Sequence, residues 1–347
     1  MTPYNPPRPR ILLVKLSSFG DVLHTLPTLE ALRAAYPGAH ITWLVEAAYA
    51  PLLAGHPALD EVWAAPRLRP GELFGGANPA RLMRLLKQLR TRSFDLVVDV
   101  QGLLKSAVWV ALARSPRKVG YDQTRELSYL PLTERVPPFD PEAHAVRRYL
   151  NLAHHLGAPP ALPRFRLGLD AGVDTAALLP TAADRPLAVL HPGARWATKL
   201  WPAASWARLA EWLHGRGLQV AITGSAADQE LVAGINRRSR APVVNLAGST
   251  SLAQLAGILR KTRLAVTTDT GAMHLAAALG TPVVALFGPT APWRTGPFGA
   301  GHEVVRLGLP CSPCFQRRCP EPRCLQELPP NLVTAACEKI LSQAANS

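Results

Sequence analysis

Short apolar runs alternate with longer amphipathic runs along nearly the whole chain, and this alternation restricts the fold more than any other feature. The short runs are aliphatic and β-branched without polar alternation, which is typical of strands buried on both faces of a parallel sheet. In the first half we expect strands at 10–16, 40–46, 60–65 and 94–100, and helices at 21–35, 79–91, 103–113 and 142–156. This order predicts a doubly wound α/β domain.

The same alternation starts again after a stretch rich in Pro, Ala and Gly. We expect strands at 186–192, 218–224, 242–248, 263–269 and 281–288, and helices at 203–215, 227–239, 251–260, 271–279 and 331–344. The pattern predicts two Rossmann-like doubly wound domains, 1–160 and 185–347, joined by a linker at 161–184. Ligands of such sheets bind at the carboxyl ends of the strands, so we expect a central cleft between the domains.

The net charge of +14, from 38 Lys and Arg against 24 Asp and Glu, favours an anionic partner. The cations are scattered and have few aromatic neighbours, which argues against nucleic acid. A phosphorylated substrate and an anionic membrane surface remain as interpretations. The N-terminus lacks the apolar core of a signal peptide, and no uncharged apolar run approaches the ~18 residues of a membrane span. We therefore expect a cytoplasmic protein.

Several common motifs are missing or out of context. Neither G-x-G-x-x-G nor the P-loop pattern occurs, so the nicotinamide and P-loop interpretations lose their main support. The D-T-G at 269–271 is also the signature of aspartic proteases. Those enzymes need two such strands in an all-β fold, whereas this single copy leads into a predicted helix.

Asp21 follows the first predicted strand after a small-residue turn that ends in Gly20. One interpretation is local: Ser18-x-x-Asp21 is a capping-box pattern, in which the carboxylate accepts from free N–H groups and favours the helix dipole. The other is catalytic, because a carboxylate at the carboxyl end of a strand faces the ligand edge and can accept a proton from a hydroxyl nucleophile. Both interpretations stay open on the sequence.

Two turns of the second half resemble an anion site. Lys199 lies in a Gly/Thr/Lys loop after a predicted strand, and Asp269, Thr270 and Gly271 lead into a helix that carries His274. Backbone N–H groups at a helix N-terminus together with a lysine suit a pyrophosphate. A solvated surface lysine and a half-buried structural histidine are the alternatives.

Four of the five cysteines crowd into the Arg/Pro loop 311–324 with the spacing C-x₂-C-x₄-C-x₄-C. This spacing suits a small tetrathiolate site, either structural Zn²⁺ or an iron–sulfur cluster. Four unligated thiols in a surface loop are the alternative. The hypothetical ligands are Cys311, Cys314, Cys319 and Cys324.

Five collinear segments resemble family 9 glycosyltransferases, specifically the ADP-heptose:lipopolysaccharide heptosyltransferases. They are "ILLVKLSSFGDVLHTLPTLEALRAAYPGAHITWLVE", "DLVVDVQGLLKSA", "GYDQTRE" with "HAVRRYLNLAHHLG", "HPGARWATKLWP" and "TTDTGAMHLAAALGTPVVALFGPT". Together they span about residues 10 to 300. The resemblance implies a GT-B fold that binds the acceptor in its N-terminal domain and the ADP-sugar in its C-terminal domain.

The resemblance also implies the reaction: inverting transfer of L-glycero-D-manno-heptose from ADP-heptose to a Kdo residue of a Kdo-lipid A acceptor, at the cytoplasmic face of the inner membrane. The first-heptose enzymes are the most similar. The chain has no D-x-D motif, so we expect no metal or other cofactor in catalysis. A relative that uses another nucleotide-sugar and a non-catalytic nucleotide-binding module are the alternatives.

The resemblance assigns roles to individual residues. Asp21 matches the general base and Lys199 the phosphate-binding lysine. The remaining donor-site positions fall on Thr198, Asp228, Asp269, Thr270, Gly271 and His274, with Asp228 standing where the better-known members have Glu. The positions expected to meet the anionic acceptor fall on Lys105, Arg125, His144 and Arg148.

Overall fold

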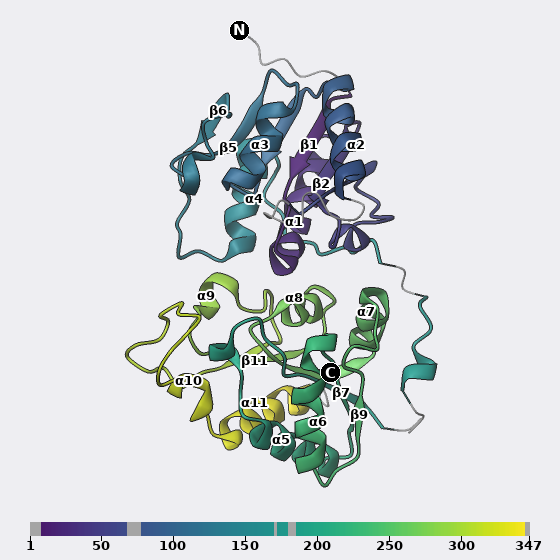
Figure 1. The fold of residues 1–347 in the computed structure, drawn as a ribbon, viewed down its shortest axis with the longest axis vertical. Helices are drawn as coiled ribbons and strands as arrows, with labels where there is room; N and C mark the ends of the chain where they lie inside the picture. Colours follow the sequence, from purple (N-terminus) through teal and green to yellow (C-terminus); the bar gives the residue numbers. More distant parts are fainter. Residues whose placement is uncertain (1–7, 68–77, 170–171, 180–184, 344–347) are drawn as a thin grey trace. The chain divides into compact units, whose positions relative to one another are not determined.

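The chain forms two compact units, Met1–Leu169 and Asp170–Ser347, in a computed structural model (Figure 1). The structure describes residues 8–67, 78–169, 172–179 and 185–343. The boundary falls inside the predicted linker 161–184, of which residues 170–171 and 180–184 lie outside the described residues.

The first unit is a six-stranded parallel sheet in the order β3-β2-β1-β4-β5-β6, with helices packed against it. The strands are β1 Arg10–Val14, β2 His40–Glu46, β3 Glu61–Ala65, β4 Leu96–Asp99, β5 Lys118–Tyr121 and β6 Glu134–Val136. The helices are α1 Phe19–Ala35, α2 Asn78–Thr91, α3 Leu104–Leu112 and α4 Ala145–His155, with 3₁₀ turns η1 Ala50–Leu52 and η2 Arg125–Leu127. The strand order reverses between β1 and β4, and doubly wound sheets bind their ligands at this switch point.

The second unit repeats the design in the order β12-β11-β10-β7-β8-β9. Its strands are β7 Leu187–His191, β8 Gln219–Ile222, β9 Val243–Asn245, β10 Thr262–Thr268, β11 Val283–Leu286 and β12 Glu303–Val305. Its helices are α5 Ala203–Gly215, α6 Gln229–Arg238, α7 Leu252–Arg260, α8 Gly271–Ala278, α9 Pro292–Thr295, α10 Arg323–Gln326 and α11 Pro330–Gln343, with η3 Ala176–Leu178, η4 Ala197–Lys199 and η5 Ala226–Asp228. The switch point here lies between β7 and β10, which pair in parallel.

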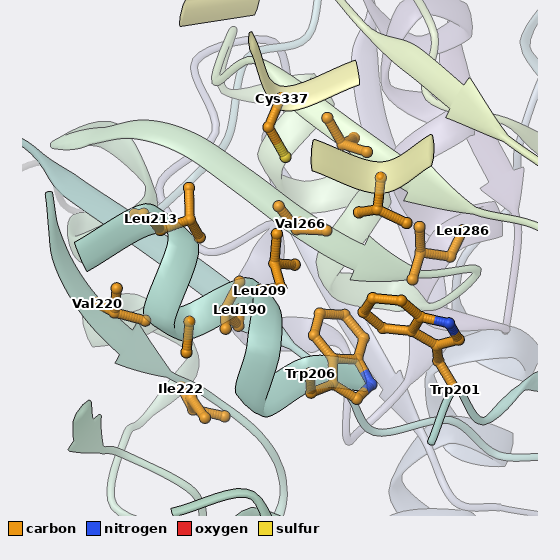
Figure 2. Packing of buried hydrophobic residues seen from close by; sticks show 14 of the residues in the cluster. Leu190, Trp201, Trp206, Leu209, Leu213, Val220, Ile222, Val266, Leu286 and Cys337 are labelled. Atoms are coloured by element: carbon orange, nitrogen blue, oxygen red, sulfur yellow. The ribbon is translucent and has the colours of Figure 1, made fainter. Parts of the chain in front are cut away.

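Each sheet has its own hydrophobic core, which accounts for the division of the chain into two compact units. Figure 2 shows part of the second core, where Trp201 and Trp206 pack edge to face with ring centroids 5.1 Å apart. The aliphatic side chains of β7, β8, β10 and β11 are almost completely buried against α5 and α11. Trp201 also donates its indole N–H to the carbonyl of Leu328, 2.8 Å away, so the buried ring leaves no polar group unpaired there.

The described parts of the predicted linker pack on one unit or the other. Gly168 N donates to the carbonyl of Leu52 at 3.0 Å, and a Cβ at Gly168 would come within 2.2 Å of the carbonyl oxygen of Ala54. On the other side of the boundary, Lys261 Nζ donates to Thr175 Oγ1 at 3.0 Å. These contacts hold Gly168 on the first unit and Thr175 on the second.

Candidate functional site

Asp21 lies in the first turn of α1, just beyond the carboxyl end of β1. Its Oδ2 accepts from the backbone N–H and the hydroxyl of Ser18, at 3.0 and 2.8 Å, so the predicted capping contact is present. Its Oδ1 accepts from the hydroxyl of Tyr149 on α4 at 2.7 Å. A carboxylate has about four lone-pair sites, and these three bonds leave about one at Oδ1 for a further donor.

Burial and four neighbouring groups control the charge of Asp21. Burial alone disfavours the carboxylate, but Lys15, His24, the Tyr149 hydroxyl and the Ser18 N–H outweigh burial and hold the pKa of Asp21 well below its usual range. Lys15 is 1% exposed and lies over the Tyr149 ring, 3.9 Å from its centroid. Burial lowers the pKa of Lys15 to about 8, although Asp21 and Asp99 oppose that shift. Asp21 is therefore an ionised carboxylate beside a buried ammonium group.

The loop that carries this pair is held by the neighbouring strand. Gln101, which follows β4, accepts with its Oε1 from the backbone N–H groups of Leu16 and Ser17 at 3.1 and 3.0 Å. Lys15 Nζ donates to the carbonyl of Val100 at 3.2 Å. The β1 and β4 ends are thus locked together at the switch point, which fixes the position of Asp21.

The predicted acceptor residues surround the same edge of the first sheet. Lys105 Nζ on α3 contacts Ser17 Oγ and forms an ion pair of 2.9 Å with Glu46 Oε1 at the end of β2. His144 caps α4, and its Nδ1 accepts from Val146 N at 3.2 Å. Arg148 on α4 keeps a buried Nε that has no hydrogen-bond partner among the described residues.

Neighbouring elements position His144 and Arg125. The His144 ring meets the ring of His24 on α1 edge to face at 5.2 Å, so packing of α1 on α4 brings His144 close to the Asp21 helix. Arg125 is exposed on η2, which adjoins the N-terminal end of α3. The acceptor candidates therefore come from α3, η2 and α4 at the carboxyl edge of this sheet.

In the second unit, Lys199 and Asp269 form a nearly buried ion pair. Lys199 Nζ donates to Asp269 Oδ2 at 2.6 Å and to the Asp269 carbonyl at 3.3 Å, and the two side chains are 14% and 8% exposed. Thr290 Oγ1 donates to the same Oδ2 at 2.7 Å. An ammonium group has three N–H donors, so one remains for an anion.

The other donor-site candidates lie on the loops after β7, β8 and β10. Thr270 is the N-cap residue of α8, Gly271 is its first residue, and half-buried His274 follows one turn in. Thr198 is buried in η4 beside Lys199, and its Oγ1 donates to the carbonyl of Gln316 at 2.9 Å. Because parallel strands end at one edge of a sheet, the predicted residues share one edge.

Asp228 lies on the loop after β8 and is engaged locally. Its Oδ2 accepts from Ser225 N at 2.8 Å and Ser225 Oγ at 2.6 Å. A Cβ at Gly193 would lie 2.6 Å from this carboxyl group, so the loop after β7 needs glycine at that position to approach Asp228. Thr268 Oγ1 donates to the carbonyl of Gly193 at 2.7 Å, which joins the β10 and β7 ends.

The prediction of a tetrathiolate metal site finds no support in the structure. Cys311, Cys314, Cys319 and Cys324 are free thiols that line a cavity of about 280 Å³, but the described residues contain no group of three or more His, Cys, Asp or Glu arranged to hold a metal ion. Burial, together with the other three cysteines, raises the pKa of Cys324. The four thiols share one loop and one cavity, and the predicted metal site is otherwise unsupported among the described residues.

Four residues of these sites were not among the sequence predictions: Lys15, Glu46, Tyr149 and Thr290. Lys15 had a usable signal, because it is the only charge inside the apolar run 11–16, and a charge in a buried strand needs a partner. Tyr149 lies 128 positions from Asp21, and the sequence around it does not predict the contact.

The fold and the two polar edges define a class of protein. Two Rossmann-like units, with an ionised carboxylate at the carboxyl edge of the first sheet and a lysine beside a helix N-terminus at that of the second, are the components of a GT-B glycosyltransferase. The family model of glycosyltransferase family 9 (heptosyltransferase) matches residues 82–325. The chain belongs to this family and is a glycosyltransferase.

Individual relatives agree with this assignment. Lipopolysaccharide heptosyltransferase 1 of Pseudomonas aeruginosa is 38% identical over 320 residues, covering 89% of this chain and 87% of that protein. The solved structure of the E. coli heptosyltransferase WaaC with ADP has a TM-score of 0.80 at 29% identity, covering 95% of this chain and 99% of that one. WaaC solved with ADP-2-deoxy-2-fluoro heptose has a TM-score of 0.76 at the same identity and the same coverage.

Proposed function

We propose that this enzyme transfers L-glycero-D-manno-heptose from ADP-heptose to a Kdo residue of the lipopolysaccharide inner core, with inversion at the anomeric carbon. The proposal rests mainly on the geometry of Asp21. This ionised carboxylate is held in place by Ser18 and Tyr149, and its Oδ1 can accept about one further hydrogen bond. The name of the P. aeruginosa relative and the ligands in the WaaC structures support heptose and ADP.

In the proposed reaction Asp21 is the general base. The acceptor hydroxyl gives its proton to Asp21 Oδ1 as its oxygen forms a bond to the anomeric carbon, and the bond from that carbon to the β-phosphate oxygen of ADP breaks. The low pKa of Asp21 makes it a weak base in the ground state. The low pKa also keeps Asp21 ionised before the acceptor binds. The ammonium group of Lys15 interacts electrostatically with Asp21, so the two charges are coupled when Asp21 takes the proton.

The leaving ADP gains negative charge, which Lys199 and the N-terminus of α8 would neutralise. Asp269 and Thr290 hold the Lys199 region in place through three hydrogen bonds, and one ammonium N–H remains for a phosphate oxygen. The free backbone N–H groups at Gly271 and beyond favour an anion there. Thr198 and His274 are proposed to line the same phosphate region, and Asp228 to meet the ribose.

The proposed acceptor is anionic, and cations cluster on the acceptor side. Lys105 and Arg125 carry charge at α3 and η2, and the unpartnered buried Nε of Arg148 is a donor without an acceptor among the described residues. A buried polar group without a partner costs stability, so a sugar carboxylate or phosphate at this position would relieve that cost. His144 would contribute a further donor.

We place the enzyme at the cytoplasmic face of the inner membrane, as a peripheral protein. The net charge of +14 supports attraction to anionic lipids, and the proposed acceptor is itself a membrane lipid. None of the helices in the described part of the chain has both the length and the hydropathy to cross a bilayer.

The test is turnover by purified enzyme with a Kdo₂-lipid A analogue and one donor at a time. We expect product with ADP-heptose and little with UDP-sugars, and we expect the new linkage to have the anomeric configuration opposite to that of the donor. Turnover with a UDP-sugar instead would assign another donor. Tight ADP binding without any transfer would indicate a nucleotide-binding module.

A further inference from the structure

Helix α3 carries an apolar stripe on its exposed face. Leu104, Val108 and Leu112 are 56%, 42% and 43% exposed, and their spacing of four residues places them on one side of the helix. The opposite side is buried, with Trp109 and Val110 at 1% and 0% exposure in the core of the first unit. A helix on a protein surface normally presents polar residues to solvent, whereas this face of α3 presents leucine and valine side chains.

The neighbouring turn, which contacts α3, carries further exposed apolar side chains. Leu127 and Leu130 are 59% and 61% exposed, and they follow Glu126, whose Oε2 accepts from the backbone N–H of Leu104 at 2.9 Å. Exposed clusters of this kind mark interaction sites. We call this set the α3 patch; its members are Leu104, Val108, Leu112, Leu127 and Leu130.

Cations border the α3 patch. Lys118 Nζ donates to the carbonyl of Ala111 on the exposed face of α3 at 3.2 Å, and Arg114 reaches the carbonyl of Arg90 at the end of α2 at 3.2 Å. Arg125 adjoins the other end of the patch. Between residues 78 and 130 the chain has ten Lys or Arg against four Asp or Glu, of which Glu126 is the acid beside the patch. Helices α2 and α3 touch each other and contain no acidic residue.

We propose that the α3 patch docks the enzyme on an anionic phospholipid membrane, with the aliphatic side chains in the headgroup region and the bordering cations on lipid phosphates. Apolar side chains beside Lys and Arg are the composition that binds such interfaces. A second copy of this chain is the weaker occupant, because a two-fold contact would bring the cation borders of both copies together. The inference rests on the proposed function in that the acceptor is a lipid.

The position of the patch fits this role. Leu104 directly precedes Lys105, which pairs with Glu46 and contacts Ser17, four residues before Asp21. Docking through α3 therefore brings the acceptor edge of the first sheet to the membrane surface, where the lipid-linked sugar lies. In Figure 1 α3 and η2, the turn between β5 and β6, belong to the same unit as α1 and α4.

The test is binding to phosphatidylcholine vesicles with and without phosphatidylglycerol, measured by co-sedimentation at low and high salt. We expect the wild type to prefer the anionic vesicles and to lose affinity as salt rises. The double variant Val108→Glu/Leu112→Glu should bind at least about tenfold more weakly, because it withdraws aliphatic carbon and adds negative charge. Leu332→Glu, on α11 and also 43% exposed in the wild type, is the matched control and should bind like wild type.

Vesicle binding is read without turnover, so the inference and the proposed function can fail separately. The double variant should retain wild-type turnover with a water-soluble acceptor fragment, which shows that it folds. Equal vesicle binding by wild type and double variant would overturn the inference, as would a wild-type dimer that the double variant converts to a monomer. A wild type that binds vesicles through the patch but transfers no heptose would overturn the proposed function alone.

Discussion

Asp21 makes the predicted capping contact and is also the proposed general base, two interpretations that the sequence left open. Its Oδ2 closes the capping contact with Ser18, and its Oδ1 meets Tyr149. Since the two oxygens have different partners, capping and the proposed proton transfer would not compete for the same atom. The local spacing predicted the first contact, whereas the second depends on the packing of α1 on α4.

The hydroxyl of Tyr149 should matter for catalysis. Tyr149→Phe keeps the ring under Lys15 but removes the donor to Asp21 Oδ1. The hydroxyl holds Asp21 Oδ1 in position, and the loss of this positioning should outweigh the higher basicity of the freed carboxylate, so we expect kcat to fall on the order of tenfold with the KM for ADP-heptose unchanged. The pKa of Asp21 should rise, and the acid limb of the kcat/KM profile should move to higher pH. A wild-type profile and kcat would show that Tyr149 has only a packing role.

The low pKa of Asp21 should also be visible in stability. Folding lowers the pKa of Asp21 from its ordinary value of 3.8. At a pH above 3.8 the ionised carboxylate therefore stabilises the native state, and this contribution to stability is lost as the pH falls from 3.8 through the lowered pKa. The difference in melting temperature between wild type and Asp21→Asn should therefore be largest near neutral pH and shrink in acid. Asp140→Asn, at an exposed position, is the control substitution measured over the same pH range. A wild-type advantage that grows in acid would contradict the assignment.

Among the elements, most strands and helices were predicted close to their observed positions, whereas the strands β5, β6 and β12 were not predicted. Strands β1 and β10 and helices α5 and α8 were found within two residues of the predicted bounds. The strands β5, β6 and β12 have four, three and three residues, too few for a periodic signal, and they form by pairing with a strand already in place. β6 and β12 lie at sheet edges and β5 lies between β4 and β6, so each of the three depends on pairing with a neighbouring strand.

Lys199, in the loop before α5, should affect the use of ADP-heptose and not the binding of the acceptor. Lys199→Ala removes the remaining ammonium donor, so we expect a raised KM for ADP-heptose and a lower kcat, with little change in the KM for the acceptor. Thr290→Val removes another donor to Asp269 Oδ2 without changing the charge, and it should have the smaller effect. Equal effects would mean that the loss comes from disturbing Asp269.

Brief EDTA treatment should leave activity unchanged, and recovery of EDTA-treated enzyme on adding Mg²⁺ would contradict the metal-independent mechanism.

The cysteines of the second unit should differ in reactivity. Cys337 on α11 is 0% exposed, and burial raises the pKa of its thiol to about 12. We expect a thiol reagent at pH 8 to modify the four loop cysteines in the native protein and Cys337 only after unfolding. Protection of all four loop thiols in the native protein, together with bound Zn or iron, would restore the metal-site hypothesis that the structure does not support.

At the scale of the whole molecule, the repeated alternation was enough to predict two doubly wound sheets, and both sheets have the same strand order. The polar edges were predicted because parallel strands end together, so Asp21 and Asp269 could be assigned to such edges from sequence position alone. The ion pair of Lys199 with Asp269 joins residues 70 positions apart. Its geometry follows from the packing of the loops and is absent from the local pattern.

The most direct test of the account is the rate of heptose transfer by Asp21→Asn under saturating ADP-heptose and Kdo₂-lipid A analogue. An amide can still accept the capping bonds of Ser18 but cannot take the acceptor proton. We predict a kcat lower by about 10²- to 10⁴-fold, with ADP affinity and the far-UV spectrum of the wild type. Wild-type kcat in this variant would contradict the central claim that Asp21 is the general base.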